Sequence, residues 1–202
     1  MILQNNRKLK YRLKRLIEVS TRYLIRYYTP PWNDEMVTIT FDDGPLPSTL
    51  DVLNELREYK KKAIFFLVAE NIKKYPEVSK KIVEEGHLIG LHGYTHTDMK
   101  KLKLSEFSSK IKEGLGVIKE ICGVETKYFR PPFGRINLSQ TLWLLTHGFT
   151  LFFWSCGVSE DGEFDFINPE IEKINNTNKN RFIVLLHDYL SLSIIRDVLK
   201  KF

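Results

Sequence analysis

The sequence is poor in cysteine and has neither a long apolar run nor an internal repeat. Its two cysteines, Cys122 and Cys156, cannot build a disulfide framework, which fits a reducing compartment. No run of about 18 apolar residues could cross a membrane as a helix. The N-terminus also lacks the apolar core of a cleavable secretory signal. We therefore expect a protein of the cytoplasm, or one held peripherally at the inner face of a membrane.

The composition is that of an ordinary globular protein with a basic surface. With 202 residues, 43% hydrophobic and 28% charged, the chain can form one domain with a sizeable core. The net charge of +6 comes largely from the first 30 residues. Because the sequence has no named nucleic-acid motif and no repeat of arginine and aromatic residues, no nucleic-acid partner is expected. The charge equally suits an anionic glycan or lipid.

Residues 1–33 differ in composition from the rest of the chain. Apolar residues recur there at helical spacing with lysine and arginine between them, which predicts a basic amphipathic helix. This helix could pack on the flank of the domain, or residues 1–30 could lie on an anionic membrane surface. Pro30 and Pro31 end it. We therefore divide the chain into a helical extension, 1–33, and a catalytic domain, 34–202.

Short apolar segments alternate with helical patterns through this domain. The expected strands are 36–41, 62–68, 88–91, 128–129, 150–154 and 181–186. The expected helices are 48–59, 77–85, 105–122, 138–146 and 194–200, and a short helix is expected at 169–174. Ser48 and Ser105 are the expected N-caps. Residues 157–168 are expected to form a polar loop. Six alternations of strand and helix predict an α/β fold with parallel strands joined by right-handed crossovers.

Polar residues that could perform chemistry stand at the carboxyl ends of the expected strands. They are Asp42, Asp43, His92, Arg130 and His187. In a parallel barrel these ends meet on one face, where active sites lie. We therefore expect these side chains to meet in space, although they are far apart in the sequence.

His92 and His96 are separated by three residues, so both imidazoles could bind one metal ion. With Asp43 they form a two-histidine, one-carboxylate set. Three protein ligands and an open position are typical of a catalytic zinc site, in which the metal lowers the pKa of a bound water. The plain alternatives are an Asp-Gly turn after a strand and histidines that only fill the core.

Two further residues could move protons, and a third could hold one of them in place. Asp42 could be a general base, held and kept ionised by a bidentate contact from Arg130, and His187 could be a general acid. A capping aspartate, a surface arginine and an inert histidine at a strand end are the corresponding structural alternatives. His87 and His147 are interpreted as structural. A Cys156 nucleophile is not expected because no base stands beside it in the sequence.

Four segments resemble motifs of the polysaccharide deacetylase family, carbohydrate esterase family 4, also called the chitooligosaccharide deacetylase or NodB homology domain. Their order and spacing match, and the resemblance runs from about residue 35 to about residue 190. The segments are Thr40-Phe41-Asp42-Asp43-Gly44, His92-Gly93-Tyr94-Thr95-His96, Arg130-Pro131-Pro132-Phe133-Gly134 and Ile183-Val184-Leu185-Leu186-His187.

The resemblance implies a distorted, incomplete (β/α) barrel of about seven parallel strands. It also implies a hydrolase of carbon–nitrogen bonds in linear amides, which removes an N-acyl group, above all acetyl, from an amino sugar. The substrate could be a polysaccharide, an oligosaccharide or a lipid-linked sugar, and the attacking water would be metal-activated. The implied metal is zinc, with Co²⁺, Ni²⁺ or Fe²⁺ as alternatives. The resemblance implies that Asp43, His92 and His96 bind the metal, that Asp42 is the base and that His187 is the acid. Arg130 would hold the base in place. The Phe133 backbone N–H would contact the oxyanion, and Leu185 would lie beside the acyl methyl group.

The sequence also departs from the family pattern. Phe133 stands where the family often has tyrosine, a change that keeps the backbone donor. The aspartate that would tune the acid histidine is replaced by Gly157, unless Asp161 or Asp165 reaches His187 from the loop. The tryptophan that would wall the sugar groove is missing from the same stretch. A non-catalytic glycan-binding relative and an O-acetyl esterase therefore stand as alternatives.

Overall fold

The computed structural model describes residues 37–166 and 182–202. The helix expected over residues 1–33 and the short helix expected over 169–174 lie outside these described residues. In the described part of the chain, no helix is both long enough and apolar enough to cross a membrane.

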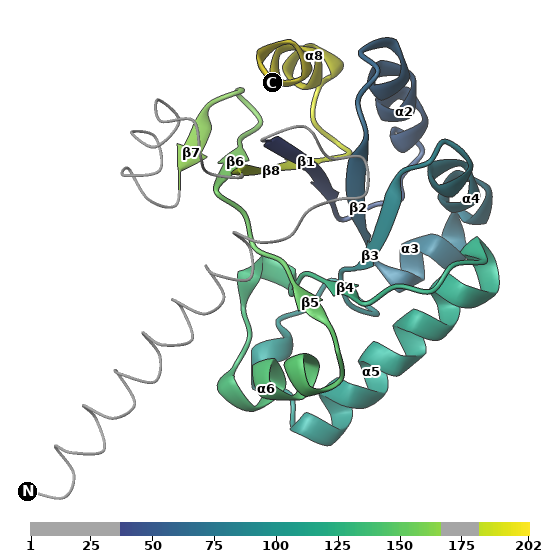
Figure 1. The fold of residues 1–202 in the computed structure, drawn as a ribbon, viewed down its shortest axis with the longest axis vertical. Helices are drawn as coiled ribbons and strands as arrows, with labels where there is room; N and C mark the ends of the chain where they lie inside the picture. Colours follow the sequence, from purple (N-terminus) through teal and green to yellow (C-terminus); the bar gives the residue numbers. More distant parts are fainter. Residues whose placement is uncertain (1–36, 167–181) are drawn as a thin grey trace, which may run out of the picture.

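A single curled sheet of eight strands forms the centre of the fold (Figure 1). The strand order is β5-β4-β3-β2-β1-β8-β6-β7, and every neighbouring pair is parallel except β6 and β7. Seven parallel strands with one antiparallel edge strand confirm the incomplete (β/α) barrel. The strands are β1 Val37–Asp42, β2 Ala63–Leu67, β3 Leu88–Leu91, β4 Tyr128–Phe129, β5 Thr150–Leu151, β6 Cys156–Val158, β7 Phe164–Phe166 and β8 Phe182–His187.

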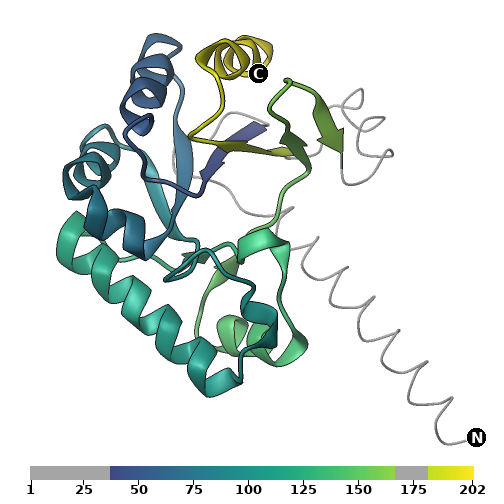
Figure 2. The same cartoon turned by 180° about the vertical axis from the view of Figure 1, so that it is seen from behind.

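Helices cover the outer side of this sheet, and the view from behind shows the same arrangement (Figures 1 and 2). They are α2 Thr49–Glu58, α3 Ala69–Lys74, α4 Pro76–Glu84, α5 Leu104–Val117, α6 Leu138–Thr146 and α8 Leu192–Lys201. A π-helical turn, Ile118–Cys122, continues α5. This accounts for the single helix expected over 105–122.

The alternation of side chains along the strands divides the interior into two layers. On β1, Ile39 and Phe41 belong to the large core under the helices. A second, smaller cluster of Ile64, Phe66, Phe152 and Ile183 fills the inner side of the curl. The alternation places Thr40 and Asp42 on that inner side, opposite Ile39 and Phe41, so the polar residues of β1 face the lumen of the half-barrel.

Several short elements differ from the sequence prediction because none of them is long enough to show a clear period. Helix α3 has only six residues and begins directly after β2, with Ala69 and Ile72 buried. The expected polar loop 157–168 includes most of β6 and all of β7, which form an antiparallel hairpin closed by the turn from Ser159 to Gly162. The strand expected over 150–154 is limited to two residues, β5.

The two predicted helix caps have different outcomes. Ser48 occupies the N-cap position of α2, as predicted, but its side chain makes no capping hydrogen bond. Helix α5 starts at Leu104, one residue before Ser105, so Lys103 occupies the N-cap position. Instead, Thr49 Oγ1 accepts a hydrogen bond from the Leu46 N–H at 2.8 Å and fixes the chain that enters α2.

Candidate metal centre and active site

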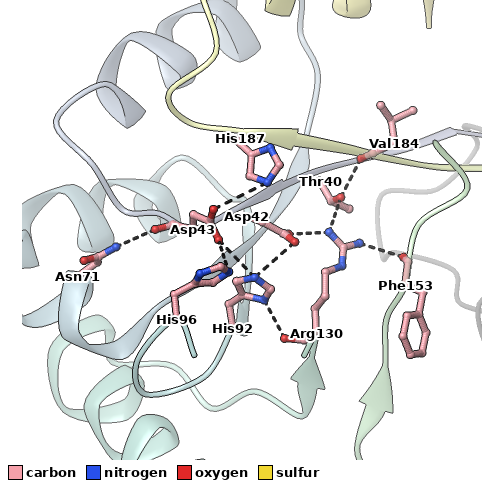
Figure 3. Close-up of polar contacts among 10 residues, drawn as sticks. All are labelled: Thr40, Asp42, Asp43, Asn71, His92, His96, Arg130, Phe153, Val184 and His187. Carbon is pink, nitrogen blue, oxygen red and sulfur yellow. Dashed lines mark hydrogen bonds and ion pairs between the residues drawn. The ribbon is translucent and has the colours of Figure 1, made fainter. Parts of the chain in front are cut away.

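The polar residues predicted at strand ends come together at the carboxyl edge of the sheet (Figure 3). Asp42 is the last residue of β1 and Asp43 follows it. His92 follows β3 and Arg130 follows β4, whereas His187 is the last residue of β8. Asp42 and His187 lie opposite each other in the register of β1 and β8. The parallel strands thus deliver five reactive side chains to one place.

Asp43, His92 and His96 form a compact cluster of possible metal ligands. One donor atom of each lies within 4.8 Å of the others. Asp43 Oδ1 is 3.4 Å from His92 Nε2 and 3.2 Å from His96 Nε2. Two ligands of a tetrahedral zinc ion with bonds of about 2.0–2.2 Å would lie about 3.3–3.6 Å apart. The spacing therefore fits three ligands of one small divalent ion.

The hydrogen bonds around His92 support the same interpretation. His92 Nδ1 lies 2.8 Å from the Arg130 carbonyl oxygen, which can only accept, so Nδ1 carries the proton. In the neutral ring, Nε2 then presents a lone pair toward Asp43. Asp43 Oδ1 is buried and has no hydrogen-bond partner. Lone pairs that face each other in a buried site favour a cation between them.

The titration behaviour of this cluster follows from burial and mutual charge. Burial alone would raise the pKa of Asp43, but the electrostatic effect of the nearby His92, His96 and His187 outweighs it and lowers that pKa. Burial lowers the pKa of His96, against the opposing effect of Asp43. An ionised carboxylate beside a neutral imidazole is the state in which both groups bind a metal.

Asp42 is held by a wholly buried arginine. Arg130 Nη1 donates to Asp42 Oδ1 at 2.6 Å and to Thr40 Oγ1 at 2.8 Å, and Nη2 donates to the Phe153 carbonyl at 3.1 Å. The guanidinium also lies 4.2 Å from the Phe66 ring centroid. Asp42 Oδ2 stays on the metal-ligand side, 3.7 Å from His92 Nε2. One carboxylate oxygen is therefore anchored and the other faces the cluster.

Helix α3 holds both loops that carry the cluster. The Val68 N–H donates to the Gly44 carbonyl, and the Ala69 N–H donates to the Gly93 carbonyl. Asn71 Nδ2 donates to the Asp43 carbonyl at 2.7 Å. Asp43 itself adopts φ 71°, a left-handed conformation that costs energy in a residue other than glycine. The sequence offered no indication of Asn71, because a single asparagine in a short helix belongs to no recognisable pattern.

His187 lies beside the cluster, with Nε2 3.8 Å from Asp43 Oδ2. Gly157 pairs with Leu185 in the sheet, so this position provides no carboxylate for His187. Asp161 accepts a hydrogen bond from Ser159 instead, and Asp165 lies on β7, separated from β8 by β6. The carboxylate that the structure brings to His187 is therefore Asp43.

Phe133 and Leu185 complete the surroundings predicted from the sequence. Phe133 has φ 57°, and its ring centroid lies 4.4 Å from that of His96. Leu185 is buried on β8, two residues before His187, and therefore on the same side of the strand. Two site residues, Asp43 and Phe133, thus share the left-handed backbone conformation that is often found at functional sites.

Asp188 is a buried carboxyl next to the site that the sequence did not single out for a role. Its Oδ2 accepts a hydrogen bond from Thr49 Oγ1, and its Oδ1 has no partner. Burial raises its pKa to about 7, against the opposing effect of the Thr49 hydrogen bond. The contact ties the end of β8 to the start of α2.

The other histidines and the cysteines have structural surroundings. His87 Nδ1 accepts the Ala63 N–H at 3.2 Å, and His147 stacks on Trp143 at 4.2 Å. Burial raises the pKa of Cys122 to about 11 and that of Cys156 to about 12. Neither thiol would ionise near neutral pH, which agrees with the prediction that no thiol nucleophile operates here.

The sequence model of the family described as Polysaccharide deacetylase matches residues 29–152, more than half of the chain. The chain belongs to the polysaccharide deacetylase family. This match contains the segments of Asp42, Asp43, His92, His96 and Arg130, and it ends before His187. The family resemblance expected from the four motifs is thus confirmed.

Members of the polysaccharide deacetylase family with curated names include two informative relatives. The chain is 36% identical over 141 residues to a peptidoglycan-N-acetylglucosamine deacetylase of Bacillus cereus, a match that covers 66% of this chain and 51% of the relative. It is 31% identical to a chitooligosaccharide deacetylase of Azorhizobium caulinodans, over 77% of this chain and 75% of the relative. The chain therefore spans about half the length of the first relative.

Solved structures of the family share the fold. The crystal structure of the Bc1960 peptidoglycan N-acetylglucosamine deacetylase superposes with a TM-score of 0.71 at 28% identity. The superposition covers 86% of this chain and 84% of that one.

Proposed function

We propose that this protein is a divalent-metal-dependent hydrolase that removes an acetyl group from the nitrogen of an amino sugar in a glycan. The observation that carries the proposal is the meeting of Asp42, Asp43, His92, His96 and His187 at one edge of the sheet. Relatives named for peptidoglycan N-acetylglucosamine and for chitooligosaccharides support an amino-sugar substrate. A module that only binds glycans would need neither a proton acceptor nor a proton donor beside the ligand cluster.

Asp43, His92 and His96 would hold the divalent ion, which would supply a Lewis acid for the acyl carbonyl and for water. Zinc is the metal that this ligand set favours, with cobalt, nickel and iron as alternatives. Asp43 Oδ1, which has no other partner, is the carboxylate oxygen available to it.

Two side chains would move the protons. Asp42 Oδ2 would accept a proton from the attacking water, because Arg130 holds the other oxygen, Oδ1. As the new carbon–oxygen bond forms, the Phe133 N–H would donate a hydrogen bond to the carbonyl oxygen that becomes negative. His187 would give its proton to the amine as the carbon–nitrogen bond breaks. The products are acetate and the free amino sugar.

A panel of acetylated sugars tests the proposal. The purified protein, loaded with zinc or cobalt, is assayed for acetate and free amine with N-acetylglucosamine oligomers, peptidoglycan and a lipid-linked N-acetylated sugar. Equal release of acetate and amine, lowered about 10²- to 10⁴-fold by Asp42→Asn, is expected. Metal-loaded protein that releases no acetate from any substrate would overturn the proposal, and acetate without amine from an O-acetylated sugar would indicate an esterase.

Contact with an anionic membrane through residues 1–30 stays a prediction from the sequence, as does a location in the cytoplasm or at the inner membrane face. The basic amphipathic pattern supports both. Co-sedimentation of the full chain with vesicles containing anionic lipid, compared with a chain that lacks residues 1–30, is the direct measurement. Equal sedimentation of the two chains would contradict the membrane contact.

A further inference from the structure

Tyr189 presents a flat aromatic surface beside the site that none of the roles above uses. It lies in the turn after β8, two residues beyond His187, and half of the residue is exposed (50%). Its ring stacks on the His187 ring, with the centroids 4.9 Å apart and the planes at 18°. Because the stack covers one ring face, the exposed surface lies on the other face and at the edge.

Exposed aromatic rings in the described residues are concentrated at this site. The large apolar side chains with substantial exposure are four leucines, Phe133 and Tyr189. Both aromatic rings pack on histidines of the site, Phe133 on His96 at 4.4 Å and Tyr189 on His187 at 4.9 Å. Aromatic side chains left in contact with water beside a polar cluster are typical of ligand-binding surfaces.

The turn that carries Tyr189 is fixed on both sides. Asp188 is buried and accepts a hydrogen bond from Thr49. Leu190 is buried in the main core, and its N–H donates to the His187 carbonyl at 3.1 Å. The backbone that carries the ring is therefore fixed, and binding of a ligand to the ring should cost little free energy for ordering this turn.

We infer that Tyr189 is a specificity-determining residue, and that its free face binds the pyranose ring next to the acetylated sugar in an oligosaccharide. A pyranose has faces of C–H groups, which are apolar and flat enough to cover an aromatic ring, while its hydroxyls stay at the edge in water. In the proposed mechanism His187 gives its proton to the amine, so the ring stacked on His187 would lie beside the neighbouring sugar. The inference rests on the proposed function and extends it to the length of the substrate.

Binding of sugars of different length tests this inference. Dissociation constants are measured by calorimetry on metal-loaded protein in an Asp42→Asn background, which slows turnover, with the tetramer of N-acetylglucosamine and with the single sugar. Tyr189→Ala should weaken binding of the tetramer about tenfold and leave binding of the single sugar within twofold. Tyr189→Phe, which keeps the ring, should bind the tetramer like the parent.

Two controls separate this effect from damage to the fold. Leu142→Ala truncates a side chain on α6 of similar exposure (52%) and should leave both dissociation constants unchanged. Thermal melting should show that Tyr189→Ala folds like the parent. If Tyr189→Ala leaves the dissociation constant of the tetramer unchanged, the inference is overturned. This holds even if turnover falls, because loss of the stacking contact can affect His187 without affecting sugar binding. Protein that binds the tetramer but does not hydrolyse it overturns the proposed function alone, and protein that binds neither sugar overturns both.

Discussion

Arg130 Nη1 lies 2.6 Å from Asp42 Oδ1, and both side chains are buried in the lumen of the half-barrel. Burial lowers the pKa of Arg130, against the opposing charge and hydrogen bond of Asp42. The two charges therefore compensate each other in a place where either alone would be costly.

Removing only the arginine should destabilise the fold strongly. Arg130→Met leaves the Asp42 carboxylate buried without its partner, so the free energy of unfolding should fall by about 3–5 kcal/mol at neutral pH. Urea denaturation measures this change. The double variant Arg130→Met, Asp42→Leu removes both charges and should recover most of the loss. A double variant as unstable as the single one would show that the arginine acts through packing alone.

Asn71 should control metal affinity without touching the metal. Asn71→Ala removes the hydrogen bond to the Asp43 carbonyl and frees the loop that orients this ligand, so zinc affinity should fall about 10- to 100-fold. Competition with a chromophoric chelator measures the affinity. Glu70→Ala is the matched control, because Glu70 lies one residue earlier in α3 and its side chain is exposed. Its contact with the Tyr94 carbonyl is made by the backbone N–H, which the substitution keeps. Equal affinities in the two variants would contradict this role.

His187→Ala should separate chemistry from metal binding. Loss of the proton donor should lower turnover of an acetylated oligosaccharide about 10²- to 10⁴-fold. Zinc content and affinity should stay close to those of the wild type, because the proposed ligands are Asp43, His92 and His96. Measuring the zinc content together with the activity distinguishes a proton donor from a metal ligand. Loss of zinc in this variant would indicate that His187 is a ligand.

His87 should make the protein less stable in weak acid. Burial, followed by the nearby Lys62 charge, lowers the pKa of His87 from 6.5 to about 4 in the folded state. Its stabilising contribution is complete above pH 6.5 and is lost as the pH falls from 6.5 to 4, which amounts to about 3 kcal/mol.

His87→Gln tests this pH dependence, because glutamine does not titrate and its side-chain oxygen can accept the Ala63 N–H. The free energy of unfolding, measured by urea denaturation at steps between pH 4 and 7, should fall less steeply in the variant than in the wild type. Parallel curves for the two proteins would show that His87 does not cause the loss.

Much of the site could be predicted because parallel strands impose it. Once β1, β3, β4 and β8 are identified as parallel strands of one sheet, the residues at their carboxyl ends must lie at one edge of that sheet. The four segments that resemble the polysaccharide deacetylase motifs contain these same residues. What could not be predicted depends on contacts between segments with weak patterns. Helix α3 is too short to show a period, and the β6–β7 hairpin lies in a polar stretch where sheet pairing outweighs local preference. Burial of Asp188 likewise depends on Thr49, 139 residues away.

The six residues of α3 join two loops that follow different strands. Gly44 and Asp43 lie on one side of this junction and Gly93 and Tyr94 on the other, each held by a bond from residues 68–71. An ion that draws both loops together would suppress local opening of this helix. Deuterium uptake at the amides of Val68, Ala69 and Glu70 should therefore slow when zinc is added, which would make this junction a reporter of metal occupancy that needs no substrate.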